Sequence, residues 1–216
     1  MKPVVISAGG SASQCQQPRG WLGRLMLWNM NARHSGVTDW GLSHVTVNER
    51  DTILDIGCGG GRTLSKLASA ARQGKVYGID HSEASVAASK KTNANGIKTG
   101  QIEVRLGSVS ELPFPDNMFD LVTAVETHFW WSNLPHDMRE TFRVVKTGGR
   151  FIAIAEIYKG ANTRVAKMAE QYASRTDMTL LSVDEHRELL VNAGYSDVQV
   201  SEERDKGWIC AVGKKV

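Results

Sequence analysis

The stretch Thr52-Ile-Leu-Asp-Ile-Gly-Cys-Gly-Gly-Gly61 decides the fold of this chain, because a short apolar run ends there in a cluster of glycines. The run from Thr52 to Ile56 has the length and apolar character of a buried parallel strand. From Arg62 to Gln73, leucine and alanine recur on one helical face, and Gly74 stands where a C-terminal cap belongs. The stretch therefore predicts a strand, a glycine-rich turn and a helix in direct succession.

Strands and helices alternate in the residues that follow. Four further apolar runs have the length of strands: Val76 to Ile79, Ile102 to Leu106, Phe119 to Val125 and Arg150 to Ala155. Helices are expected from near Ser82 to Gly96, from near Pro135, and from the capping box at Ser182 to Gly194. Because βα units repeat, we expect an α/β fold with a largely parallel sheet and helices on both faces.

The end of the chain follows a different pattern. Val198 to Ser201 and Trp208 to Val212 are predicted strands joined by a short polar link. A link of this length suits two antiparallel strands, whereas parallel strands need a long crossover. We therefore expect an antiparallel hairpin at one edge of the sheet.

The length of 216 residues suggests one domain. Residues 1–20, rich in Gly, Ser and Gln, are expected to be a flexible arm, and residues 21–216 the domain itself. Within it, residues 21–48 are interpreted as an N-terminal cap segment, with a helix over Trp21 to Met30 and an irregular part from Asn31 to His44. The chain is expected to be a monomer or a homodimer.

Composition excludes several classes of protein. The net charge is only +3 and Lys and Arg are scattered, so no basic surface for nucleic acid is predicted. The three cysteines have neither a zinc pattern nor a disulfide pattern, which favours a reducing, cytoplasmic environment. No apolar run approaches the ~20 residues that cross a bilayer, so membrane insertion is not expected.

The glycine-rich turn is a predicted nucleoside site. Ligands of doubly wound sheets lie at the carboxyl ends of the strands, where glycines let the backbone approach them and the next helix presents free N–H groups. Asp80 ends the second strand, 19 residues after Gly61, where a carboxylate can accept hydrogen bonds from ribose hydroxyls. Each feature has a plainer explanation, since glycines ease the entry into a helix and an acid caps one. Together they favour binding.

The spacing of the glycines disfavours nicotinamide cofactors. A dinucleotide fingerprint G-x-G-x-x-G/A needs a small third residue, and counting from Gly57 or from Gly59 places Arg62 or Leu64 there. The phosphate-binding pattern G-x-x-x-x-G-K-[ST] is absent as well. Nucleotide-dependent reduction is therefore the least favoured function.

Four motifs occur in order along residues 50–156: Asp55-Ile-Gly-Cys-Gly-Gly-Gly61, Gly78-Ile-Asp80-His-Ser82, Leu106-Gly-Ser-Val-Ser-Glu-Leu-Pro-Phe-Pro-Asp-Asn-Met-Phe-Asp120 and Arg143-Val-Val-Lys-Thr-Gly-Gly149. This succession resembles the class I S-adenosylmethionine-dependent methyltransferase family, especially its subgroup of ubiquinone, menaquinone and other small-molecule methyltransferases. The resemblance implies a Rossmann-like, seven-stranded, mostly parallel sheet with an antiparallel edge hairpin. It also implies S-adenosyl-L-methionine as cofactor, S-adenosyl-L-homocysteine as product, and a small-molecule acceptor.

The resemblance also assigns cofactor contacts. Asp55 corresponds to the acid that helps to place the amino end of the methionine part in the family. Asp80, with His81 beside it, corresponds to the acid that accepts hydrogen bonds from the ribose hydroxyls. The family usually offers an Asp to the adenine amino group. Here Ser108 replaces it, a weaker acceptor, and the backbone N–H of Val109 can face the ring. The expected cofactor-binding residues are Asp55, Gly57, Cys58, Gly59, Gly61, Asp80, His81, Ser108, Val109 and Glu126.

The acceptor side is expected after the fourth strand, at Glu126-Thr-His128-Phe-Trp-Trp131. Methyl transfer is a direct displacement that needs alignment, and a base where the acceptor must lose a proton. The carboxylate of Glu126 would stabilise the positive charge of the sulfonium. His128 is the candidate base because its unperturbed pKa is near neutrality. His128 can equally be a packing residue, and Trp130 and Trp131 can line the acceptor site or pack in the core.

Two further segments can border the acceptor. His34 lies in the irregular part of the cap segment and is a candidate pocket residue. Residues 158–181 are interpreted as an insertion near the acceptor pocket, or as a plain packing helix. No close spacing of His, Asp and Glu supports a metal site.

Alternative functions remain open at this point. Protein or RNA methylation lacks a target-recognition region and strong charge, and the Asn/Asp-Pro-Pro-Tyr/Phe run typical of amide and base methylation is absent. A non-catalytic S-adenosylmethionine-binding regulator is a further alternative. The leading hypothesis is methyl transfer to a small molecule.

Overall fold

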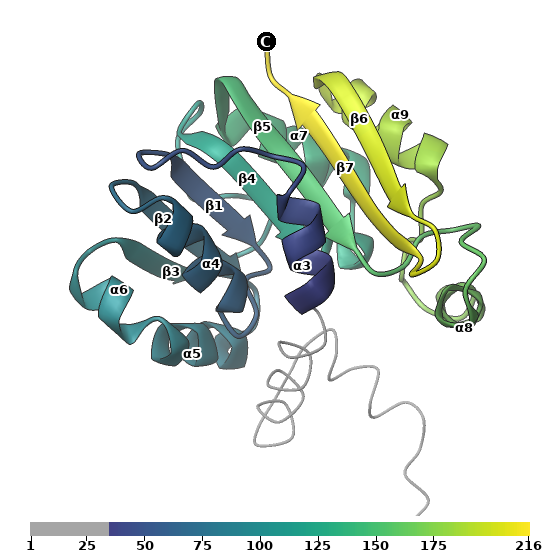
Figure 1. Cartoon of the computed structure of the whole chain (residues 1–216), viewed down its shortest axis with the longest axis horizontal. Coiled ribbons are helices and arrows are strands. Elements are labelled where there is room, and N and C mark those ends of the chain that lie inside the picture. The colour runs from purple at the N-terminus through teal and green to yellow at the C-terminus, as the bar shows by residue number, and fades with distance from the viewer. Residues whose placement is uncertain (1–34) are drawn as a thin grey trace, which may run out of the picture.

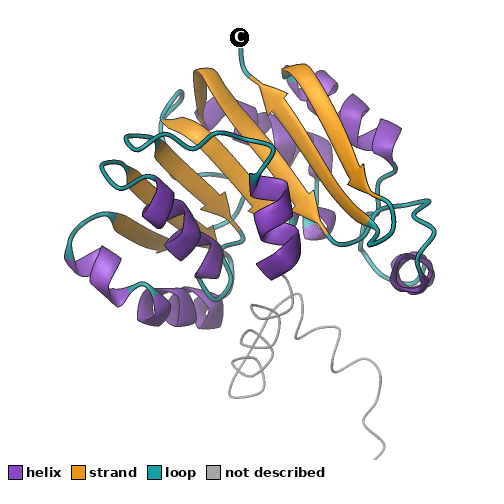
Figure 2. Ribbon diagram, viewed as in Figure 1, coloured by secondary structure: helices purple, strands orange, loops and turns teal. Residues whose placement is uncertain are grey.

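Seven strands form one sheet in the part of the chain that the computed structural model describes, residues 35–216 (Figures 1 and 2). The strands are β1 (Thr52–Ile56), β2 (Lys75–Asp80), β3 (Ile102–Leu106), β4 (Phe119–Val125), β5 (Val145–Ala155), β6 (Ser196–Glu203) and β7 (Trp208–Lys214). Their order across the sheet is β3-β2-β1-β4-β5-β7-β6. Strands β1 to β5 pair in parallel, and β7 is antiparallel to both β5 and β6.

Helices cover both faces of this sheet. The described helices are α3 (Ser35–Leu42), α4 (Arg62–Ala70), α5 (Glu83–Thr92), α6 (Ala94–Lys98), the 3₁₀ turn η1 (His128–Trp130), α7 (Leu134–Val144), α8 (Arg164–Ala173) and α9 (Val183–Ala193). In Figure 1, α3 and α4 lie in front of the sheet and α7 and α9 behind it. The predicted Rossmann-like α/β fold, with a mostly parallel sheet and an antiparallel pair at one edge, is confirmed.

Two buried apolar layers hold the helices to the sheet. In front, Leu64 and Leu67 of α4 pack with Val76 and Ile53 of the inner strands. Behind, Met138 of α7 and Leu190 of α9 share a core with strand residues. Alternating side chains of one strand point to opposite faces, so β1 contributes Ile53 to the front and Leu54 to the rear. Both faces of β1 are therefore buried, as its apolar sequence predicts.

One sequence-based prediction is wrong. Residues 35–42, expected to be irregular, form helix α3, which lies across β5 and β7. The buried face of α3 includes Val37 and Gly41, and the missing side chain of Gly41 lets the helix approach Ile154 on β5. Tertiary packing thus stabilises a helix that contains two glycines. The expected arm over residues 1–20, the helix over 21–30 and His34 lie outside the described residues.

Two helix boundaries also differ from expectation. Helix α4 ends at Ala70 instead of Gln73, and the helix after Ser82 is broken at Asn93 and resumes as α6, up to Lys98. Asn93 ends α5 because its buried side-chain amide donates to the carbonyl oxygens of Ser89 (3.0 Å) and Gly61 (2.8 Å). A contact with a loop 32 residues away leaves no local sequence signal.

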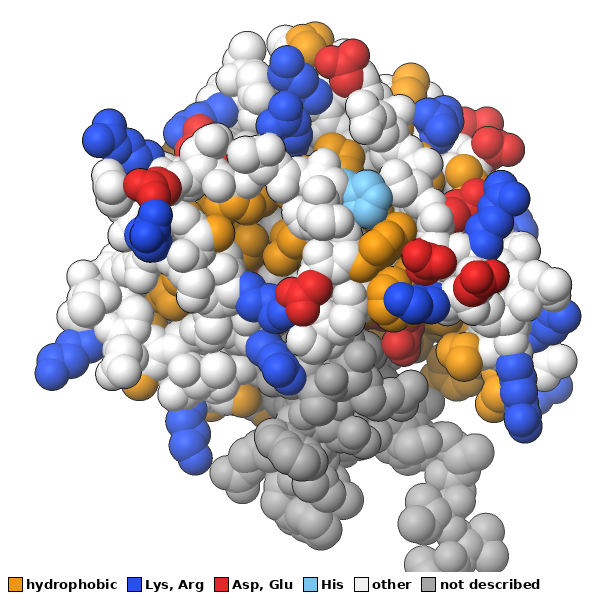
Figure 3. Space-filling model, viewed as in Figure 1, with side chains coloured by type: hydrophobic (Ala, Val, Ile, Leu, Met, Phe, Trp, Pro, Cys, Tyr) orange, Lys and Arg blue, Asp and Glu red, His pale blue; other side chains and the backbone are white. Residues whose placement is uncertain are grey.

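Charged side chains are mixed on the surface. On the face in Figure 3, Lys and Arg are interspersed with Asp and Glu, in keeping with the scattered charges of the sequence. The expectation that the chain does not bind nucleic acid stays a prediction. No helix within residues 35–216 is long and apolar enough to span a bilayer.

The contact between α3 and β5 gives a first prediction. A Cβ at Gly41 would lie 2.5 Å from two side-chain atoms of Ile154, which is itself fully buried. Gly41→Ala should therefore lower the free energy of unfolding by about 1–3 kcal/mol through overpacking, although alanine favours helix. Denaturant unfolding of the whole chain measures this value.

The matched control is Gly36→Ala in the same helix. A Cβ there would lie 3.3 Å from one ring atom of Trp208, a tight but relievable contact. This variant should be about as stable as the parent chain. Equal stability of both variants would show that α3 does not depend on close approach to Ile154.

Candidate functional site

A cleft of about 290 Å³ opens at the carboxyl ends of the parallel strands. One side is built by Asp80, the last residue of β2, and by residues that follow β2 and β3, among them His81, Ser108 and Val109. The other side is built after β4 by Thr127, Trp130, Trp131 and Ser132, and Gly57 after β1 lies in the cleft lining between them. The sequence prediction of a ligand site at this edge of the sheet thus coincides with a cavity.

The glycine-rich loop is fixed by backbone hydrogen bonds to β2. The N–H groups of Gly57 and Cys58 donate to the carbonyl oxygen of Ile79, at 2.8 and 3.1 Å. Gly57 has φ +70°, and a Cβ there would lie 2.3 Å from the hydroxyl oxygen of Thr127. Only glycine fits this position, because it tolerates positive φ and leaves room for the neighbouring loop.

Asp80 joins this loop to the start of α5. Its carboxylate accepts hydrogen bonds from the N–H of Gly59 and the N–H of Ser82, both at 2.9 Å. A carboxylate has about four lone-pair positions, so each oxygen can accept a further bond from a ligand in the cleft. Asp80 is largely buried, whereas about half of the His81 side chain is exposed beside it.

Asp55 lies deeper, beneath the loop. It is buried on β1 and accepts a hydrogen bond from the Thr123 hydroxyl at 2.7 Å, across the parallel pairing of β1 and β4. Burial, aided by the negative charge of Asp80, raises the pKa of Asp55 to about 7 although the Thr123 bond lowers it. A carboxyl group in this state gains charge when a cation comes close.

Ser108 and Val109 form the wall that follows β3. The Ser108 hydroxyl oxygen accepts a hydrogen bond from the N–H of Ser110 at 3.1 Å, so its own hydrogen is available to a ligand. Both residues line the cleft, as the sequence predicts. Cys58, Gly59 and Gly61 do not line it: Cys58 is buried below the loop, Gly59 donates to Asp80, and Gly61, with φ +81°, is the N-cap of α4.

Glu126 and His128 lie beside the cleft, outside its lining. Glu126 directly follows β4 with φ +58°, and its carboxylate accepts a hydrogen bond from the N–H of Glu156, directly after β5. His128 is only 2% exposed. Its Nε2 lies 3.0 Å from Nε2 of His186 on α9, and Nδ1 of His186 lies 2.7 Å from the carbonyl oxygen of Ser182.

These contacts fix the tautomers of both histidines. A carbonyl oxygen only accepts, so Nδ1 of His186 carries the proton and Nε2 of His186 is an acceptor. Nε2 of His128 must then donate, which leaves Nδ1 of His128 unprotonated, buried and without a partner. Burial lowers the pKa of both histidines, that of His128 far below its usual range.

The expected insertion adjoins this histidine. Helix α8 lies beyond the end of β5 (Figure 1), and its Tyr172 contacts the ring of Trp130 edge-on. The N–H of Thr179 donates to the carbonyl of Phe129 in η1 at 2.9 Å. Residues 158–181 therefore pack on the segment that carries His128 and Trp130.

Sequence reasoning missed several residues that position the site: Asn93, Thr123, Thr127 and His186. Each acts through a neighbour that is distant in sequence. For Thr123 the sequence contained one signal: a hydroxyl on a predicted inner strand is buried and therefore needs a hydrogen-bond partner, which a buried acid can supply. His186 had none, since it lies within an ordinary helix pattern.

The comparison with known families agrees with this geometry. Residues 54–153 match the family described as a methyltransferase domain. Residues 54–153 thus resemble a methyltransferase domain, and the match covers a little less than half of the chain. Within the described residues no group of three or more His, Cys, Asp and Glu side chains could hold a metal ion.

Curated proteins match either part of this chain at higher identity or most of it at low identity. A demethylmenaquinone methyltransferase of Symbiobacterium thermophilum is 40% identical over 105 residues, which are 48% of this chain and 42% of that protein. The chain thus matches less than half the length of such enzymes. The methyltransferase YdaC of Bacillus subtilis, whose activity is uncharacterized, is 23% identical over 86% of this chain and 95% of its own.

Solved structures share the fold. A SAM-dependent methyltransferase from Aquifex aeolicus superposes with a TM-score of 0.70 at 21% identity, covering 88% of this chain and 97% of that one. Geranyl diphosphate C-methyltransferase from Streptomyces coelicolor was solved with geranyl diphosphate and S-adenosyl-L-homocysteine. It superposes with a TM-score of 0.71 at 15% identity, covering 85% of this chain and 79% of that one.

The residues that line the cleft fit a nucleoside cofactor. The carboxylate of Asp80 can accept further hydrogen bonds from hydroxyl groups of a ligand. Because Gly57 has no side chain, the loop that carries Thr127 can lie close to it, and both residues line the cavity. The walls also carry apolar and aromatic side chains, such as Val109 and Trp131, beside which an adenine ring or a methyl-bearing sulfur can pack.

The raised pKa of Asp55 predicts an unusual dependence of stability on pH. A buried acid with a folded-state pKa of about 7 and an unfolded value near 3.8 binds more protons when folded. Its contribution to stability therefore falls as pH rises from about 4 to about 7. Asp55→Asn, which has the same shape and does not titrate, should remove this decline, as measured by urea unfolding of the parent chain and the variant across that range.

A second variant tests the cause of the shift. Thr123→Val removes the hydrogen bond that lowers the pKa of Asp55, so the decline should extend to higher pH. If stability fell equally with pH in the parent chain and in Asp55→Asn, the raised pKa would not belong to Asp55.

Proposed function

We propose that this chain transfers the methyl group of S-adenosylmethionine to a small-molecule acceptor by direct displacement. The observation that carries the proposal is Asp80, which ends β2 in the cleft lining and is tied to the glycine loop through Gly59. The demethylmenaquinone methyltransferases that match residues of this domain act on small molecules by their names, which supports the same class of acceptor.

The cofactor contacts follow from the positions of the site residues. In this proposal Asp80 accepts hydrogen bonds from the ribose hydroxyls, with the half-exposed His81 beside it. Ser108 and Val109 face the adenine ring, and the glycine loop from Gly57 follows the methionine part. Asp55 stabilises the positively charged amino end from below, and such a cation would draw the proton off its carboxyl group.

The acceptor would enter from the side of η1 and α8. Phe129, Tyr158 and Met178 belong to an apolar cluster there, with Trp130 and Tyr172 packed against it. This composition favours an acceptor with an aromatic or extended apolar body. Because Tyr158 donates to Glu202 at 2.7 Å, the cluster also contains a fixed polar pair.

Two residues carry the proposed chemistry of the acceptor. Nδ1 of His128 is the basic nitrogen, since it is unprotonated and has no other partner, and Nε2–H of His128 is held by His186. When Nδ1 takes a proton, the bond to His186 becomes charge-assisted and stronger. The carboxylate of Glu126, directly after β4, would stabilise the positive charge of the sulfonium.

Equilibrium binding is the first test of the proposal. The chain should bind S-adenosylmethionine and S-adenosylhomocysteine in a titration calorimeter and ignore NADH. Incubation with a metabolite extract and S-adenosylmethionine should yield a product heavier by one methyl group. Binding of NADH alone would overturn the proposal, and tight cofactor binding with no methylated small molecule would favour a regulator or a macromolecular acceptor.

Asp80→Ala should weaken cofactor binding by about 1–3 kcal/mol, or roughly 5- to 150-fold, because it removes hydrogen bonds to a charged group. Asp120→Ala is the matched control. Asp120 also accepts a backbone N–H, that of Thr52, and binds Lys146, but it lies at the other end of the strands. It should lower stability without changing affinity. Equal affinity loss in both variants would remove Asp80 from the site.

His128→Asn should lower turnover roughly 100-fold or more and leave cofactor affinity nearly unchanged, if His128 is the base. Because burial holds its pKa far below 6.5, turnover should not fall through this group between about pH 8 and 6.5. His136→Asn, at a half-exposed histidine of α7, is the control. Similar losses of affinity and turnover in His128→Asn would make the residue structural.

A further inference from the structure

The wall of the cleft that follows β3 is tied to the sheet near its start, where the N–H of Gly107 donates to the carbonyl oxygen of Asp80 on β2 at 3.0 Å. Further along, the side chain of Arg105 on β3 donates to the carbonyl oxygen of Pro113 at 3.0 Å. Residues 107–110 line the cavity, in a connection that runs from β3 past β2 and β1 to β4. Within residues 107–111 the hydrogen bonds run from the N–H of Ser110 to the Ser108 hydroxyl and, at a long 3.4 Å, from the N–H of Glu111 to the Ser108 carbonyl. Such a loop needs an external hold to keep one shape.

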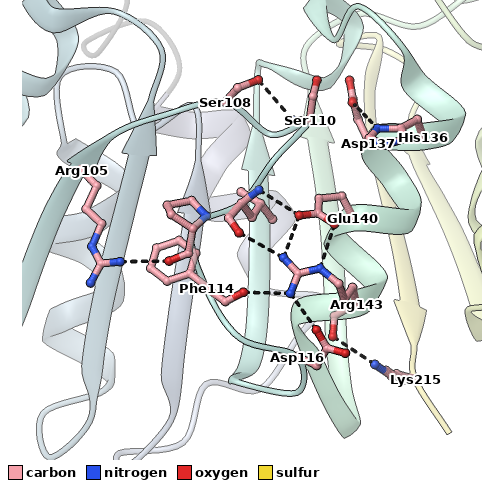
Figure 4. Close-up of polar contacts among 12 residues, drawn as sticks. Arg105, Ser108, Ser110, Phe114, Asp116, His136, Asp137, Glu140, Arg143 and Lys215 are labelled. Carbon is pink, nitrogen blue, oxygen red and sulfur yellow. Dashed lines mark hydrogen bonds and ion pairs between the residues drawn. The ribbon is translucent and has the colours of Figure 1, made fainter.

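Helix α7 supplies that hold through Arg143 and Glu140 (Figure 4). The guanidinium of Arg143 donates to the carbonyl oxygens of Leu112 (3.0 Å) and Phe114 (2.8 Å) and to the carboxylate of Asp116 (2.8 Å). Glu140 accepts two bonds from Arg143, at 2.7 and 2.8 Å, and one from the N–H of Leu112 at 2.9 Å. All five N–H donors of Arg143 are used.

The same helix starts at the opposite wall. Trp131 and Ser132 line the cleft, and the Asn133 side chain directly after them caps α7. Helix α7 therefore connects the wall after β4, at its first turn, to the wall after β3, through its last turns. Met138 and Leu134, buried under the sheet, keep it from shifting.

We propose that Arg143, held by Glu140, is a positioning residue for S-adenosylmethionine, which keeps residues 107–110 in the shape that faces the adenine ring. This inference rests on the proposed role of these residues in cofactor binding. Arg143 does not line the cleft, so it acts through the loop. The fork of a guanidinium is required, because a lysine ammonium cannot reach two carbonyls and two carboxylates in one plane.

Burial of Leu112 and Phe114 is the competing explanation for the shape of the loop. Both side chains lie in the rear core, where Phe114 packs on Tyr77 and Phe119. If burial alone were sufficient, loss of Arg143 would lower stability a little and leave residues 107–110 unchanged. The two explanations thus differ in what they predict for the loop.

Two measurements on the full chain separate them. Arg143→Lys should raise the Kd for S-adenosylmethionine roughly tenfold or more, with kcat at saturating cofactor little changed. Amide hydrogen exchange of residues 107–111 should become faster in the same variant without ligand. Arg143→Ala and Glu140→Gln should shift both readouts in the same direction, and if Arg143→Ala does not fold, the other two variants decide.

Lys146→Ala is the matched control. Lys146 follows α7 and binds Asp120 through both carboxylate oxygens, so its loss removes a similar ion pair without touching residues 107–118. Its Kd and its exchange in 107–111 should equal those of the parent chain. Unchanged exchange in Arg143→Lys, or faster exchange with unchanged Kd, would overturn the proposal. A parent chain that does not bind S-adenosylmethionine would instead overturn the proposed function, and hydrogen exchange would still test the hold on the loop.

Discussion

The two hydrogen bonds that the Asp80 carboxylate accepts connect three parts of the molecule. One comes from Gly59, in the loop after β1, and the other from Ser82, at the first turn of α5. They are possible because β1 and β2 pair in parallel and in register, so that Ile56 lies beside Ile79 and both strands end at one edge. The floor of the cleft depends on this tie.

Asp80, in the lining of the cleft, and Asp55, beneath the glycine loop, have opposite surroundings. Asp80 receives two N–H donors, which satisfy a carboxylate, whereas Asp55 has one hydroxyl partner and is enclosed by apolar strands. Burial of a poorly solvated carboxyl group costs free energy, and the raised pKa of Asp55 expresses that cost. A site that stores this cost in the free protein gains affinity for a cation that relieves it.

The walls of the cleft are held from outside it. Asn93 fixes the end of the glycine loop, His186 orients His128, and Arg143 holds the connection after β3. All three donate or accept through side chains whose partners lie far away in sequence. The side chains that line the cleft are few, and their geometry depends on a larger set that lies outside the lining.

The amino-acid sequence by itself determined the order of the strands, the glycine loop with Asp80, and the resemblance to methyltransferases, because each is carried by local patterns of a few residues. Only the tertiary structure decided that residues 35–42 are helical, because their burial on β5 and β7 outweighs the low helix propensity of glycine. It also decided the protonation of His128, which follows from a contact 58 residues away. Such contacts depend on how the layers pack, and no pattern in one stretch of chain contains that information.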